Sequence, residues 1–165
     1  MKFKIENEIF EKYPELKIGI IVVKDIDNTG QDDEILKKVQ DEIEKIRQNH
    51  SKPTLSENPK IAAWRKAYSS FGAKPKKYKC SVENLYRMIL DDIDLKHYSK
   101  LVDIYNYISL KYMIPVGGDD IDHVDGNITL KFAEGNEKFI QLNSLEESNP
   151  KEGEVVYCDD NEVLC

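Results

Sequence analysis

The sequence feature that most constrains the fold is the segment over residues 101–122, LVDIYNYISLKYMIPVGGDDID. It combines a helix that has both polar and apolar sides with a proline that ends this helix. A helix is predicted over residues 98–113, and its side chains follow one another at about 100°. Asp103, Asn106 and Ser109 then share an arc of roughly 120° on this helix. Apolar residues interleave with that arc, so it is predicted to be half-buried. Buried polar groups need hydrogen-bond partners, which are either neighbouring backbone or a ligand.

The end of the same segment predicts a turn whose backbone can adopt conformations that are open to few other residues. Pro115 ends the helix, because proline cannot continue it. The residues that follow are Val116, Gly117, Gly118, Asp119 and Asp120. Two consecutive glycines let the backbone bend sharply or approach another group closely. The segment as a whole is therefore the candidate for the centre of a functional pocket.

The rest of the chain predicts an α+β fold. Apolar residues at intervals of three and four predict helices over residues 33–48 and 59–71 and another that begins at Ser81. KIGIIVVK, residues 17–24, predicts a buried strand. Alternation and turn residues predict short antiparallel strands over residues 127–133, 138–142 and 154–157. Helices in the middle and strands near the end are typical of the α+β class.

Length and charge limit the function. The 165 residues predict one domain over 1–165, and no apolar run approaches the ~20 residues of a membrane span. The three cysteines are widely spaced without a CxxC motif, which favours a soluble protein of the reducing cytoplasm. A net charge of −7 argues against a general nucleic-acid binder, since such proteins are mostly basic.

One basic cluster interrupts this acidic chain. AKPKKYK, residues 73–79, contains Lys74, Lys76, Lys77 and Lys79. The cluster first of all indicates a solvated loop. The alternative is a loop that contacts phosphates, which the acidity of the rest of the chain favours.

Motifs of known catalysts are absent from the sequence. It has no GxSxG, no P-loop and no GxGxxG, and His50 and His97 lie in polar contexts that predict surface positions. One acidic group has the residue types of a metal site: Asp119, Asp120, Asp122, His123 and Asp125. Its spacing does not match an EF-hand loop, and aspartates near glycines commonly stabilise turns. Neither a metal nor a cofactor is predicted.

Several stretches together resemble a known family. These are residues 58–71 (NPKIAAWRKAYSSF), Gly72, Pro75, residues 81–85 (SVENL) and residues 101–122. They resemble the B3/B4 domain, the tRNA-editing module of the bacterial phenylalanyl-tRNA synthetase β subunit, and more closely the free-standing proteins built from that domain. The resemblance implies an unusual β-sandwich flanked by helices. It also implies a chain that continues beyond Cys165, so this one is expected to be truncated or to differ in its last element.

The resemblance assigns roles to individual positions. The family's VD-x-x-N-Y asparagine is Asn106 here, and the aspartate that closes its P-x-H-A-F-D pattern is Asp120. The histidine of that pattern is replaced by Gly117, and a threonine beside the asparagine is replaced by Tyr105. Asn106, Gly117, Gly118 and Asp120 are therefore the catalytic candidates. The candidates for substrate binding are Asp103, Tyr105, Ser109, Val116 and Asp119.

The function that the resemblance implies is hydrolysis of mischarged aminoacyl-tRNA in trans. Lys74, Lys76, Lys77 and Lys79 would contact the tRNA locally. The alternative is a non-catalytic module that binds tRNA, an amino acid or a protein partner in the same pocket. A third possibility is that Asp103 and Asn106 only stabilise the fold.

Overall fold

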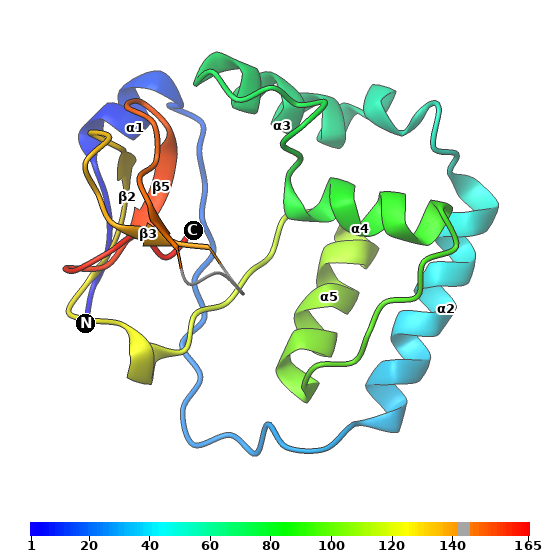
Figure 1. Ribbon diagram of the computed structural model, residues 1–165. Helices are drawn as coiled ribbons and strands as arrows, with labels where there is room; N and C mark the ends of the chain where they lie inside the picture. Colours follow the sequence, from blue (N-terminus) through cyan, green and yellow to red (C-terminus); the bar gives the residue numbers. More distant parts are fainter. Residues whose placement is uncertain (142–145) are drawn as a thin grey trace. The chain divides into compact units, whose positions relative to one another are not determined.

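The structure, a computed structural model, describes residues 1–141 and 146–165. It divides into two compact units (Figure 1). Residues 1–22 and 119–165 form the first, which we call the strand unit, and residues 23–118 form the second, which we call the helical unit. The single domain predicted over residues 1–165 stays a prediction.

The helical unit contains the longer helices of the described chain. They are α2 (Asp33–Asn49), α3 (Pro59–Ser70), α4 (Ser81–Leu90) and α5 (Lys100–Tyr112), with a 3₁₀ turn, η1 (Leu55–Glu57), before α3. Helix α2 packs against α4 and α5, and η1 packs against α3. The helices predicted from the sequence are confirmed, and their ends differ from the predictions by one or two residues where both were given.

Local side-chain chemistry explains where these helices begin and end. The carboxylate of Asp32 accepts a hydrogen bond from the backbone amide of Ile35, and the side-chain oxygen of Asn58 accepts one from the backbone amide of Lys60. Such caps satisfy amides that the first helical turn leaves free. Helix α3 is followed by Gly72 at φ +90°, a conformation that glycine adopts without strain. Caps and breakers in the sequence thus mark the ends of α2 and α3.

An apolar core joins the elements of the helical unit. Its fully buried side chains come from η1, from all four helices and from their flanks: Ile43, Ile46, Leu55, Ile61, Cys80, Val82, Tyr86, Ile89, Leu110 and Met113. Trp64 and Tyr68 of α3 pack against this core from its margin. Each fully buried aliphatic side chain contributes roughly 1.5–3 kcal/mol, so the core fixes α4 and α5 as rigid supports.

The strand unit contains two small sheets. The first has the order β1 (Phe3–Ile5), β2 (Ile128–Phe132), β5 (Val155–Cys158), and the second pairs β3 (Phe139–Ile140) with β4 (Glu147–Ser148). Phe3 pairs with Ile128 in the parallel ladder, and Phe132 pairs with Val155 in the antiparallel one. A short helix, α1 (Asn7–Lys12), and a 3₁₀ turn, η2 (Ile121–His123), complete this unit.

The α+β class is confirmed, but one predicted strand is wrong and one strand was not predicted. Residues 17–24 form no strand, and Ile21 is 88% exposed. In the described chain no ladder includes this segment, so its β-branched composition lacks the partner strand that a sheet requires. The sequence also missed β1, whose pairing with β2 is parallel and not antiparallel.

The strands near the C-terminal end agree better with the sequence. The strands predicted over 127–133 and 154–157 are confirmed as β2 and β5. The strand predicted over 138–142 is shortened to β3, and Leu142 lies outside the described residues. None of the helices in the described ranges is long and apolar enough to cross a membrane.

Candidate ligand-binding site

The polar arc of α5 points into the helical unit. Asp103 is 5% exposed and Ser109 is 1% exposed, while Asn106 is half-buried. By contrast, Ile104 and Tyr112 on other sides of the helix are 40% and 50% exposed. The half-buried polar stripe predicted from the sequence is therefore confirmed.

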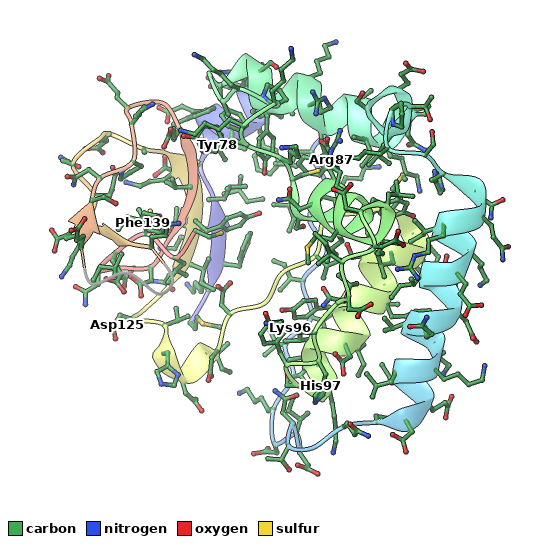
Figure 2. The ribbon with its side chains drawn as sticks, turned by 45° about the vertical axis from the view of Figure 1, so that its right-hand side comes forward. Tyr78, Arg87, Lys96, His97, Asp125 and Phe139 are labelled. Atoms are coloured by element: carbon green, nitrogen blue, oxygen red, sulfur yellow. The ribbon has the colours of Figure 1, made fainter. Side chains whose placement is uncertain are left out.

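Two of the three polar side chains have their hydrogen-bond partners within the protein. Asp103 Oδ2 lies 2.5 Å from Nδ1 of His97, and Ser109 Oγ donates to the carbonyl of Ile114 at 2.7 Å. Figure 2 labels His97 at the N-terminal end of α5. The structure gives no hydrogen bond to the Asn106 side chain from any residue in the described ranges. Asn106 is thus the member of the stripe that remains available to a ligand.

After α5 the chain reaches two glycines without side chains, Gly117 and Gly118, and the second lies beside the ring of Tyr105. The helix ends through Met113, which adopts the left-handed conformation at φ 51°. A Cβ at Gly118 would lie 3.7 Å from Cε1 of Tyr105, so Gly118 packs along this ring. A Cβ at Gly117 would meet no described atom within 4 Å. Burial raises the pKa of the Tyr105 phenol, which therefore stays neutral at physiological pH.

Val116 and the two acidic candidates have different surroundings. Val116 is half-buried, and it belongs to the helical unit together with Gly117 and Gly118. Asp119 and Asp120 belong to the strand unit. Partial removal from water raises the pKa of Asp119. The predicted site residues 116–120 are thus contiguous in the chain but belong to two units.

Asp120 holds the 3₁₀ turn η2 by two contacts. Its Oδ1 accepts the amide of Asp122 at 3.1 Å, and its Oδ2 lies 3.1 Å from Nδ1 of His123. These contacts lower the pKa of Asp120, with the amide of Asp122 as the larger cause. Farther along, Asp125 Oδ2 accepts a hydrogen bond from Asn161. Asp120 thus makes the turn hydrogen bond that its sequence context predicted, whereas Asp125 bonds a residue far along the chain.

The lysine cluster over residues 73–79 forms a compact loop before α4. The amides of Lys77 and Tyr78 both donate to the carbonyl of Lys74 at 2.8 Å. Lys79 Nζ bonds the carbonyl of Lys76, and the Lys77 ammonium lies 5.0 Å from the centre of the Tyr78 ring. Within the described ranges, none of these lysines has a carboxylate at ion-pair distance. Their charge is therefore open to an external anion.

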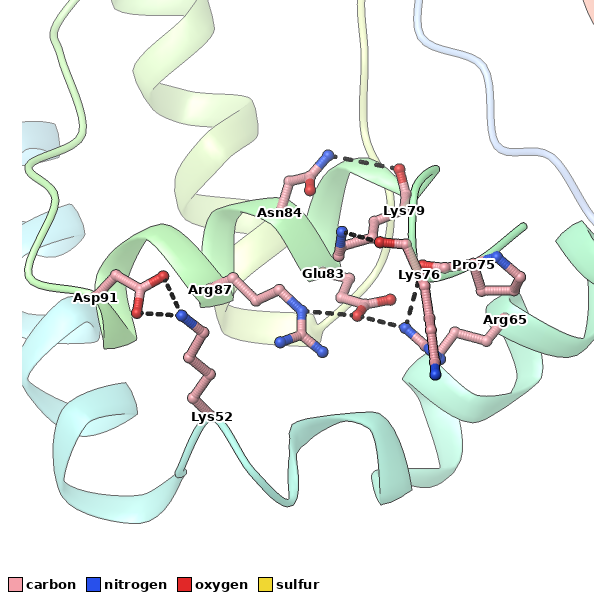
Figure 3. Close-up of polar contacts among 9 residues, drawn as sticks. All are labelled: Lys52, Arg65, Pro75, Lys76, Lys79, Glu83, Asn84, Arg87 and Asp91. Atoms are coloured by element: carbon pink, nitrogen blue, oxygen red, sulfur yellow. Dashed lines mark hydrogen bonds and ion pairs between the residues drawn. The ribbon is translucent and has the colours of Figure 1, made fainter. Parts of the chain in front are cut away.

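Helix α4 contributes a buried carboxylate beside this loop. Glu83 is 0% exposed. Its Oε1 accepts hydrogen bonds from Nη1 of Arg65 and from Nε of Arg87, both at 2.8 Å. Arg65 Nη1 also reaches the carbonyl of Pro75 at 3.3 Å, which ties α3 to the lysine loop. Figure 3 shows the two guanidinium groups meeting Glu83 from opposite sides. Glu83 Oε2 has no partner among the described residues.

Sequence reasoning missed two of these arrangements. Glu83 and Arg87 are four residues apart on one helix, a spacing at which opposite charges attract, but the third partner Arg65 comes from another helix. His97 lies at the surface, as the sequence predicted, but its ring also pairs with the buried Asp103, a contact that the sequence did not predict. The six-residue separation crosses the start of α5, so no helical period could have revealed this pair.

Two concave regions of the surface lie elsewhere. One, of about 300 Å³, lies in the strand unit, and its lining includes Lys131, Glu137 and Cys158. Burial opposes ionisation of Glu137, but hydrogen bonds from Lys131 and from backbone amides hold its pKa at about 2. The other, of about 580 Å³, lies between α2 and residues 93–95. Neither contains a predicted site residue.

Comparison with known proteins identifies the family. A family model described as the B3/4 domain matches residues 63–165. A similar protein is the phenylalanine–tRNA ligase beta subunit of Fusobacterium nucleatum subsp. nucleatum, 33% identical over 66 residues. The match covers 40% of this chain and 8% of that relative, so the chain corresponds to a small part of the ligase subunit. No solved structure matches the chain.

The chain belongs to the B3/4 domain family, because the family model covers more than half of it. The resemblance stated from the sequence is therefore confirmed. The matched range includes α4, α5, the glycine pair and the lysine loop, and thus every candidate site residue described above.

Proposed function

We propose that this protein hydrolyses the ester bond of mischarged aminoacyl-tRNA. The observation that carries the proposal is Asn106, a half-buried amide on the inward side of α5 with no protein partner among the described residues. An amide held on a rigid helix can fix the orientation of a substrate or of a water molecule. The family relationship to a phenylalanine–tRNA ligase subunit supports tRNA as the carrier of the substrate.

The proposed reaction is attack of a water molecule on the ester carbonyl, assisted by the terminal ribose hydroxyl of the tRNA. Asn106 orients the substrate or the water. The backbone amides near Gly117 and Gly118 stabilise the negative charge that develops on the carbonyl oxygen, as preorganised donors do in other acyl transfers. Asp120 fixes the following turn through its bonds to η2.

The remaining candidates shape the binding site in this proposal. Asp103, paired with His97, and Ser109, bonded to the Ile114 carbonyl, brace the stripe beside Asn106. Tyr105 and Val116 of the helical unit contact the amino-acid side chain, and Gly117 leaves room where related domains have a histidine. Asp119 is the substrate-binding candidate of the strand unit. Lys74, Lys76, Lys77 and Lys79 contact tRNA phosphates locally. The proposed compartment is the cytoplasm.

A second candidate function is a non-catalytic module that binds an aminoacyl end, an amino acid or a protein partner in the same site. Gly117 favours it, because glycine offers no side chain for proton transfer. The two functions differ in turnover. Stabilisation of the protein against heat by amino acids or tRNA, without ester cleavage, supports the binding module.

The experiment is a deacylation panel. A set of tRNAs, each charged with a cognate or non-cognate radiolabelled amino acid, is incubated with the wild-type protein and with Asn106→Ala. We expect at least one mischarged tRNA to lose its amino acid faster than the uncatalysed background, and Asn106→Ala to slow that reaction by about 10-fold or more. Asn49→Ala, an exposed asparagine at the end of α2, is the matched control. If no pair is cleaved above background, the hydrolase proposal is wrong.

A further inference from the structure

The start of α4 concentrates positive charge on one face of the helical unit. Arg65 and Arg87 pair with a single carboxylate, Glu83, and Arg65 also bonds the carbonyl of Pro75 in the loop that carries the four lysines of residues 73–79. Together these seven residues have a net charge of +5. The whole chain has a net charge of −7, so all other residues together carry −12. The basic group therefore stands out from an acidic molecule. We call these seven residues the basic face.

The lysines of the basic face differ from several other lysines of the same unit, which are ion-paired. Lys37 and Lys38 on α2 pair with Asp41 and Glu34, and Lys52 pairs with both oxygens of Asp91. Lys52 and Asp91 are drawn with the basic face in Figure 3. The lysines of residues 73–79 have no such carboxylates in the described chain. Their arrangement favours an external anion over internal pairing.

The geometry of Glu83 explains how the arginines are held. Both guanidinium groups bond one oxygen of Glu83, through Arg65 Nη1 and Arg87 Nε. A guanidinium has five N–H donors, so most donors of each arginine are left over. The structure gives Nη1 and Nη2 of Arg87 no partner in the described ranges. About a fifth of each arginine side chain is exposed, which leaves these groups partly accessible to solvent.

The same geometry is poorly suited to stability alone. Burying a carboxylate with two cations removes three charges from water, and apolar residues of similar volume commonly do as well or better. Glu83 Oε2 is fully buried and has no hydrogen-bond partner among the described residues, an arrangement that calls for an explanation. A role in fixing two arginines at the surface provides one.

We propose that the basic face binds the phosphate backbone of RNA, with Glu83 as a positioning residue that orients Arg65 and Arg87 toward it. The inference rests on the proposed function in taking tRNA as the RNA. Arginine forks and lysine ammonium groups are the usual phosphate ligands of proteins. Tyr78, 45% exposed within the lysine loop, adds an aromatic ring on which a base can stack.

The first test measures salt-dependent binding of a fluorescently labelled tRNA transcript. Lys76→Ala/Lys77→Ala removes two unpaired lysines, and Lys37→Ala/Lys38→Ala removes two lysines that are ion-paired on α2. Both doubles change the net charge equally. We expect the first pair to weaken binding by about 10-fold and to reduce the slope of log K against log salt by about 1.5, while the second leaves both nearly unchanged. Equal effects of the two doubles would overturn the proposal.

The second test isolates Glu83. Glu83→Gln makes the protein more positive by one charge, so tighter RNA binding follows if Glu83 acts only through its charge. A positioning role predicts the opposite, weaker binding by about 3- to 10-fold, because the arginines lose their anchor. Arg87→Lys is a second variant that keeps the charge and removes the fork, and it is expected to weaken binding in the same way. Unchanged or tighter binding by folded Arg87→Lys contradicts the proposal.

Two further outcomes keep this inference separate from the hydrolase proposal. Loss of tRNA binding in the Lys76→Ala/Lys77→Ala variant supports the basic face even if no deacylation is observed with any tRNA. If the same variant deacylates tRNA with an unchanged KM, the proposal that the basic face binds RNA is wrong, while the hydrolase proposal is still supported. Polyglutamate of similar charge is the competing polyanion. If it displaces the tRNA at equal charge concentration, the face does not recognise RNA.

Discussion

The helical unit buries two carboxylates, Glu83 on α4 and Asp103 on α5, and surrounds them differently. Glu83 receives two arginines on one oxygen, while Asp103 faces a single histidine, His97. Around Glu83 the excess charge extends outward to Arg65, Arg87 and the lysine loop. Around Asp103 the neighbouring polar groups point inward along α5, and one of them, Asn106, has no described partner.

The difference indicates two kinds of site on one scaffold. The carboxylate of α4 serves to hold cations at a surface, which suits recognition of a large anion. The carboxylate of α5 braces a polar stripe inside the unit, which suits a small polar group of a ligand. Both helices share one apolar core, so neither site is free to move independently of the other.

The largest expected effect is on stability at Glu83. Glu83→Ala leaves Arg65 and Arg87 without their shared anion in a partly buried place, and we expect a loss of about 3 kcal/mol in the free energy of unfolding. Urea denaturation measures it. Glu34→Ala, an exposed glutamate paired with Lys38, is the control and should change stability by less than about 0.5 kcal/mol. If both variants lost the same free energy of unfolding, the buried Glu83 cluster would be no more important for stability than the exposed Glu34–Lys38 pair, contrary to this prediction.

A smaller effect is expected at Asp103. Asp103→Ala removes the one described partner of His97, whose side chain is a third exposed and can still reach water. We therefore expect a loss of about 1–2 kcal/mol, less than at Glu83. Asp41→Ala on α2 provides the exposed comparison, and urea denaturation is again the measurement. A loss at Asp103 larger than that at Glu83 would reverse the ranking.

The sequence predicted the helices and the polar stripe, because periodicity, caps and breakers act locally. Asp32, Asn58 and Pro115 each mark a helix boundary by chemistry that needs no distant partner. The sequence could not predict the fate of residues 17–24, because a strand exists only with a partner elsewhere in the chain. The same reason hid β1, which pairs with residues about 125 positions later.

The candidate sites were predictable to different degrees for the same reason. The lysines of residues 73–79 and Asn106 were found as local patterns or by family resemblance. The Arg65–Glu83–Arg87 cluster and the His97–Asp103 pair depend on packing between separate elements, so they emerged only with the structure. Local patterns and family resemblance thus identified the candidate residues, and the tertiary structure identified the side chains that hold their neighbourhoods in place.

The smallest expected effect on stability tests the central claim, that Asn106 serves a ligand and not the fold. Asn106→Ala should change the free energy of unfolding by less than about 0.5 kcal/mol, since it removes no described hydrogen bond. In the same preparation it should slow deacylation of the mischarged tRNA by about 10-fold or more. The decisive measurement pairs urea denaturation with deacylation for this one variant. Loss of stability without any loss of wild-type deacylation would show that Asn106 only supports the fold and would contradict the account.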